Sequence, residues 1–149
     1  MKKTLTTIAV LLWACLPWPV WAQQGWKVQH FALQLEPHFE SRTIAGTLDM
    51  AFRVQDTKLQ HLDLDAGELV VGAVTLGVQA LVFEKSGTRL HITVPSGMVP
   101  GRRQHLRIAY EGKASGGLRF DADIQQVATA FSTSHWMPCL DAPSMCASF

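Results

Sequence analysis

The residues best suited to chemistry lie in the final stretch of the sequence, STSHWMPCLDAPSMCASF at positions 132–149. Ser132, Ser134, His135 and Asp141 are the residue types of a nucleophilic triad, in which a histidine is held between the nucleophile and an acid. If the stretch is extended, Ser134 and His135 point to opposite faces. The sequence also lacks a G-x-S-x-G nucleophile turn. We therefore expect these side chains to be polar residues of a strand and loop.

Cysteine and metal chemistry are the next alternatives for the same stretch. The Cys139 thiol lies four residues from His135, and these two residues with Cys146 form the one local set of zinc-type ligands. The set holds only three ligands, and Pro138 and Pro143 stiffen the chain between and beside them. We expect Cys139 to be structural and the stretch to hold no metal.

The six histidines show no zincin pattern, because none is followed by glutamate or lies four residues before another. Three of them fall in alternating stretches where a surface or half-buried position is expected. We assign no metal ligand or catalytic residue among them: His30, His38, His61, His91, His105 and His135.

Length and charge limit the function classes. A chain of 149 residues fits one domain. Its 13 basic and 12 acidic residues nearly balance, which is neither a nucleic-acid-binding profile nor a polybasic membrane profile. Gly116 and Gly117 lack the spacing and the lysine of a phosphate-binding loop, so they are predicted to form a turn.

The first 22 residues are typical of a secretory signal peptide. Lys2 and Lys3 precede the uncharged apolar run Leu5–Leu16, and VWA offers a cleavage point after Ala22. The run is too short to span a membrane, because a spanning helix needs roughly 20 apolar residues. Lipoprotein processing at Cys15 is an alternative that we do not expect.

Cleavage would leave Gln23–Phe149 as an exported chain, periplasmic or secreted, with no stable membrane span. Its apolar period is two, most clearly over Thr43–Val54, so one face of each strand is expected to be buried. The other alternating stretches are 28–36, 62–65, 70–78, 90–94 and 106–110. Turn residues gather at 84–87, 95–101 and 111–117. The pattern predicts an all-β fold, an antiparallel β-sandwich.

The order of these stretches resembles the N-terminal β domain of the M1 zinc aminopeptidases, the family of aminopeptidase N and leukotriene A4 hydrolase. The resemblance rests on LQHLDLDAGELVVGAVTL, LHITVP, LRIAYEG, GGLRF and the final WMPCLDAPSMCASF. That last segment matches the family's aromatic-x-Pro-Cys-x-Asp-x-Pro stretch near the junction with the catalytic domain. The matching residues are Trp136, Pro138, Cys139, Asp141, Pro143 and Phe149.

The resemblance implies the opening part of a longer protein, whose zinc lies in a catalytic domain encoded downstream or elsewhere. The family's H-E-x-x-H is missing, and its G-x-M-E-N cannot occur because the sequence contains no asparagine. The Gln or Glu that the β domain lends to the substrate amine is also missing from ATAFSTSHWMPC. Cys146 stands where a basic residue is expected. We therefore assign no catalytic, cofactor-binding or metal residue to this chain.

Two functions remain open on these grounds. In the first, the chain is the non-catalytic β domain of an exported M1 zinc metallo-aminopeptidase, truncated and missing its closing strands. In the second, it is a naturally short, stand-alone extracytoplasmic binding module, since fold does not fix function. A disulfide between Cys139 and Cys146 is a further open point, but we expect none, because the chain would have to double back sharply between them.

Overall fold

The computed structural model describes residues 25–129 and 132–140, and this part of the chain is almost entirely β-structure. Three of the described strands have 13, 12 and 11 residues, and the others are short. A single turn of 3₁₀ helix follows the last strand. The elements are β1 (Trp26–His38), β2 (Thr43–Val54), β3 (His61–Asp65), β4 (Val70–Leu76), β5 (Gln79–Ala80), β6 (Phe83–Ser86), β7 (Arg89–Thr93), β8 (Arg103–Lys113), β9 (Leu118–Asp121), β10 (Gln126–Thr129) and η1 (Thr133–His135).

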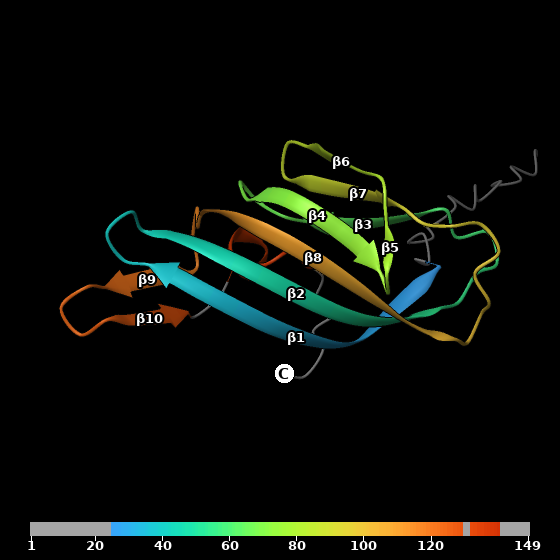
Figure 1. Ribbon diagram of the computed structural model, residues 1–149, viewed down its shortest axis with the longest axis horizontal. Coiled ribbons are helices and arrows are strands. Elements are labelled where there is room, and N and C mark those ends of the chain that lie inside the picture. The colour runs from blue at the N-terminus through green and yellow to red at the C-terminus, as the bar shows by residue number, and fades with distance from the viewer. Residues whose placement is uncertain (1–24, 130–131, 141–149) are drawn as a thin grey trace, which may run out of the picture.

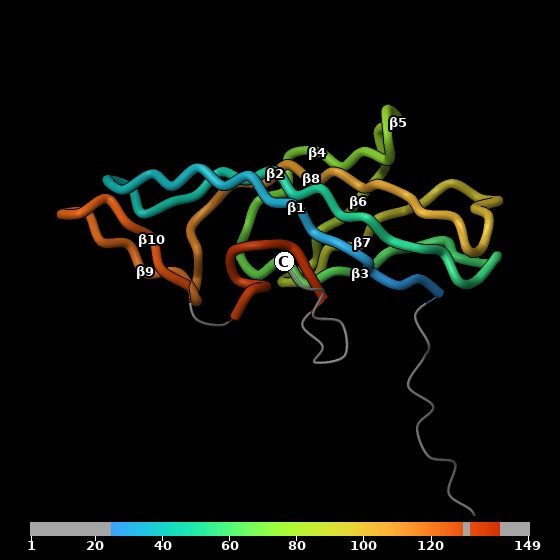
Figure 2. The backbone as a smooth tube through the Cα atoms, turned by 90° about the horizontal axis from the view of Figure 1, so that it is seen from below, coloured from blue at the N-terminus to red at the C-terminus, as the bar shows by residue number. Residues whose placement is uncertain are grey.

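The strands form two layers, which confirms the predicted sandwich. One layer is a five-stranded sheet in the order β1-β2-β8-β4-β5, and the other contains a three-stranded sheet in the order β3-β7-β6. All of their pairings are antiparallel. Figures 1 and 2 show the three-stranded sheet behind the larger one, and the two-stranded β9–β10 hairpin beneath the end where β1 turns into β2. No helix in the described residues is long and apolar enough to cross a membrane.

The predicted alternation along β2 is confirmed. Its inward side chains, among them Leu48 and Phe52, are fully buried, while Thr43, Ala45, Thr47 and Asp49 on the other face are half-exposed. The three-stranded sheet supplies the opposite wall of the core with four side chains that have no exposed surface, Leu62, Leu64, Leu90 and Ile92. Leu106 and Ile108 of β8, in the larger sheet, belong to the same core and also have no exposed surface. Burial of these apolar side chains is the main force that holds the layers together.

Two expectations about strand limits were wrong, and one hairpin was missed. Residues 84–87 were predicted to be a turn, but Glu84, Lys85 and Ser86 belong to β6 and pair with β7, so that only the tight turn at Gly87 remains. Strand β8 continues to Lys113, into the stretch predicted as a turn. The β9–β10 hairpin was not predicted, because its strands are only four residues long and mostly exposed.

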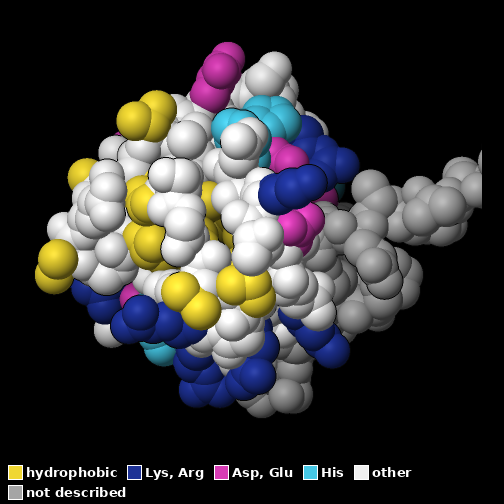
Figure 3. Space-filling model, turned by 90° about the vertical axis from the view of Figure 1, so that its right-hand side faces the viewer, with side chains coloured by type: hydrophobic (Ala, Val, Ile, Leu, Met, Phe, Trp, Pro, Cys, Tyr) yellow, Lys and Arg dark blue, Asp and Glu magenta, His cyan; other side chains and the backbone are white. Residues whose placement is uncertain are grey.

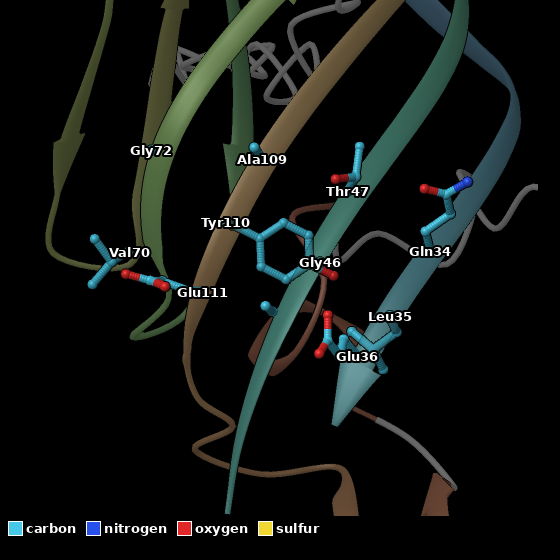
Figure 4. Close-up of a pocket in the computed structure, with 11 residues that line it drawn as sticks. Gln34, Leu35, Glu36, Gly46, Thr47, Val70, Gly72, Ala109, Tyr110 and Glu111 are labelled. Carbon is cyan, nitrogen blue, oxygen red and sulfur yellow. The ribbon is translucent and has the colours of Figure 1, made fainter. Parts of the chain in front are cut away.

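The larger sheet depends on one close contact between an aromatic ring and a glycine. In the cross-strand row that joins Leu35, Gly46 and Tyr110, the Tyr110 ring lies across Gly46, as Figure 4 shows. A Cβ added to Gly46 would lie 2.5 Å from the Tyr110 Cζ atom and 2.6 Å from its hydroxyl oxygen. Only glycine leaves room for the ring at this position.

We expect Gly46→Ala to lower the free energy of unfolding by about 2 kcal/mol, because a buried ring must move to admit the methyl group. The matched control is Gly72→Ala, whose Cβ would meet nothing closer than the Ala109 carbonyl oxygen at 3.9 Å. That control should change stability by less than about 0.5 kcal/mol. Urea denaturation of both variants measures the difference, and equal midpoints would contradict the packing described.

Tyr110 is the only tyrosine of the chain, and its hydroxyl is buried without a hydrogen-bond partner in the described residues. Burial raises the pKa of this hydroxyl far above its ordinary value, and the neighbouring Cys139 adds to the rise. Because the pKa in the folded state exceeds that in the unfolded state, the stability from the neutral phenol is complete below about pH 10 and is lost at higher pH.

We therefore expect the folded chain to show no tyrosinate absorbance up to about pH 11, whereas the urea-unfolded chain should titrate near pH 10. Absorbance at 295 nm reads this single residue directly. A midpoint near pH 10 in the folded chain would show that the Tyr110 hydroxyl is accessible to water.

Candidate functional site

The motif segment, defined here as residues 132–140, turns sharply before it enters the core. Ser132 has a left-handed backbone with a φ of 59°, and the next residues form η1 instead of the extended chain considered from the sequence. The Trp136 and Met137 amides both donate to the Thr133 carbonyl, at 3.1 and 2.9 Å. The chain then straightens toward the edge of the three-stranded sheet.

Cys139 pairs with that edge through its backbone. The Cys139 amide donates to the Asp65 carbonyl at 2.9 Å, and the Asp65 amide donates to the Cys139 carbonyl at 2.7 Å. Asp65 ends β3, the outermost strand of its sheet. The motif segment therefore caps an open strand edge, and Figure 2 shows it between β3 and the β9–β10 hairpin.

The side chains of the second half of the motif segment, residues 136–140, are buried. Trp136 is 7% exposed, Met137 1% and Cys139 5%, and Pro138 is also buried. These positions therefore act in packing within the described part of the chain. Asp141, Pro143, Cys146 and Phe149 lie outside the described residues, so the structure does not test their assigned places in the motif or the Cys139–Cys146 disulfide.

His135 contacts a serine that the sequence analysis did not single out. Its Nδ1 atom lies 2.9 Å from the Ser115 Oγ atom, and Gly116 packs against the imidazole ring. Ser134, the serine considered from the sequence, is buried. A hydrolytic triad needs a carboxylate on the other side of the imidazole. Among the described residues, His135 makes no hydrogen bond to a carboxylate. Its hydrogen bond to Ser115 links the motif segment to the loop after β8.

The histidines of the strands lie on the surface, as predicted. His30, His91 and His105 are exposed, and the His91 Nδ1 atom lies 2.5 Å from Asp63 on the neighbouring strand. Figure 3 shows histidine side chains beside acidic and basic ones near the top of one end of the molecule. Within residues 25–129 and 132–140, no group of three or more histidine, cysteine or acidic side chains is arranged to hold a metal ion.

An open hollow of about 580 Å³ crosses β1, β2, β8 and β4. Small residues such as Ala45, Thr47 and Ala109 line it, and Glu36 and Glu111 belong to the same lining (Figure 4). In the strand register these two glutamates flank Ala45, in positions two strands apart. The lining contains no serine, histidine or cysteine, and the two glutamates are its only charged side chains.

Comparison with known proteins shows which families share this architecture. The family model for the Peptidase M1 N-terminal domain matches residues 27–149. The M1 zinc metallopeptidase from Deinococcus radiodurans is similar in structure, with a TM-score of 0.70 and 24% identity over 82% of this chain and 30% of that chain. Leukotriene A4 hydrolase from Saccharomyces cerevisiae has a TM-score of 0.65 and 20% identity over 83% of this chain and 22% of that one.

No curated protein sequence matches the chain. At these identities the solved structures support the fold alone, and the chain spans less than a third of the length of either neighbour. The family itself follows from the match of the domain model over most of the chain. The chain belongs to the peptidase M1 family and corresponds to its N-terminal domain.

Proposed function

We propose that the chain is the non-catalytic β domain of an exported M1 zinc metallo-aminopeptidase, in which it positions and covers a zinc site held by another domain. The family match over residues 27–149 carries this proposal. The zinc, its ligands and the groups that bind the substrate amine would all come from the catalytic domain, which this sequence does not contain.

The chemistry of the residues present supports a non-catalytic role. A catalytic zinc site needs three protein ligands and an open position for water or substrate. The sequence has no H-E-x-x-H helix to supply them. The most motif-like residues, Trp136, Pro138 and Cys139, are buried in packing. Buried side chains of this kind stabilise a domain and fix the course of the chain that follows it.

We expect the isolated chain to bind less than about 0.1 zinc per molecule and to release no product from aminoacyl p-nitroanilides, because no open three-ligand site can be formed from it. Metal analysis after dialysis and a chromogenic assay measure both quantities. Stoichiometric zinc together with peptidase activity would overturn the proposal.

The DNA that follows the Phe149 codon should encode H-E-x-x-H, whereas an intergenic gap there would favour a stand-alone binding module.

Export is the second part of the proposal and rests on the leader at residues 1–22. We expect the intact mass of the chain from the exported fraction to correspond to a protein that begins at Gln23, because the small residues of VWA suit cleavage after Ala22. A full-length mass, or a lipid-modified chain that begins at Cys15, would contradict this expectation.

A further inference from the structure

A second hollow, of about 290 Å³, lies where the loop after β8 and the β9–β10 hairpin meet the start of β2. Figure 2 shows the hairpin beneath that end of the larger sheet. The lining, called here the basic hollow, consists of Arg42, Lys113, Ala114, Leu118, Arg119 and Phe120. Half of its residues are cations and the other half are apolar.

In the described part of the chain, no carboxylate forms an ion pair with a cation of the basic hollow. The ion pairs of the described residues join Arg89 to Asp65, His91 to Asp63 and Arg107 to Asp49, so none involves Arg42, Lys113 or Arg119. Elsewhere on the same sheet the chain does supply a counter-charge, since two guanidinium nitrogens of Arg107 contact Asp49 at 2.9 and 3.1 Å. Cations gathered in one concavity attract anions from solution.

Arg42 has an unusual backbone for a side chain of its size. Its φ is 53°, in the left-handed region, at the end of the turn between β1 and β2. Glycine adopts this conformation without strain, whereas arginine does not. Gln125 holds the same place at the end of the β9–β10 turn, with a φ of 50°. The turn therefore sets this backbone conformation and places Arg42 at the wall of the basic hollow.

The apolar part of the lining is fixed in place. The Phe120 ring packs edge-on against Phe39, with ring centroids 6.0 Å apart and an interplanar angle of 85°. Leu118 and Phe120 are half-buried and pack against the hydrophobic core. A ligand that fits this wall carries an apolar or aromatic group beside its negative charge.

We propose that the basic hollow binds a phosphate group with an adjoining apolar or aromatic group. Arginine pairs with phosphate through two parallel N–H donors, and lysine adds a point charge. A doubly charged phosphate matches several cations better than a single carboxylate does. The same chemistry belongs to a free phosphomonoester and to the headgroup region of an anionic lipid, and the test separates these sources.

The test titrates the full chain with phenyl phosphate and with inorganic phosphate in low salt by isothermal calorimetry. Phenyl phosphate should bind more tightly, and Arg42→Gly, Lys113→Gln and Arg119→Gln should each weaken it by at least roughly fivefold, as expected for a lost charge-assisted hydrogen bond. The matched control is Arg102→Gln, which removes one charge just before the opposite end of β8, about 35 Å away along an 11-residue strand, and should leave binding unchanged.

The variants also separate binding from folding. Arg42→Gly removes a left-handed arginine, so its melting temperature should not fall even though its binding does. The proposal is overturned if phenyl phosphate does not bind at millimolar concentration, or if Arg102→Gln weakens binding as much as Arg42→Gly.

A vesicle assay then identifies the source of the phosphate. Binding to phosphatidylglycerol vesicles but not to phosphatidylcholine vesicles, with displacement by phenyl phosphate and loss in Arg42→Gly, assigns the site to a lipid headgroup. Phenyl phosphate binding without vesicle binding assigns it to a free phosphomonoester. Vesicle binding that Arg42→Gly leaves unchanged would contradict a role for the basic hollow.

Discussion

The backbone pair between Asp65 and Cys139 is the contact on which the second layer depends. These hydrogen bonds, at 2.7 and 2.9 Å, hold the motif segment against the outer edge of β3. Without them, an edge strand would expose unpaired amide and carbonyl groups, and Trp136 and Met137 would lose their place in the core. A stretch with little regular structure therefore completes one wall of the sandwich.

The same segment connects the two layers. Cys139 pairs with the three-stranded sheet through its backbone and lies near Tyr110 of the larger sheet. Tyr110 in turn lies across Gly46, so the contacts run from β3 through Cys139 to the first part of β2. This chain of contacts gives the motif a physical meaning in this protein. Its described residues pack between the two layers, and we propose that this segment helps to position a catalytic domain.

The sequence predicted the features that depend on local periodicity and on a family pattern. The alternation of β2 and the apolar side chains of β3 and β7 are strong local signals, and the structure confirms them. The sequence pattern did not predict β6 or the β9–β10 hairpin, because short, exposed strands are stabilised by their partners and not by their own composition. The bond between His135 and Ser115 joins residues 20 positions apart. The basic hollow likewise joins residues from three stretches, so neither feature leaves a local pattern.

Native-state hydrogen exchange at the Asp65 and Cys139 amides tests the central claim most directly. If the motif segment closes the sandwich, both amides should open only with the whole domain, and their protection should equal that of the Leu48 and Ile108 amides in paired β2 and β8. Exchange of the Cys139 amide at the fast rate expected for the exposed β9–β10 hairpin would show that the segment opens independently and does not hold the layers together.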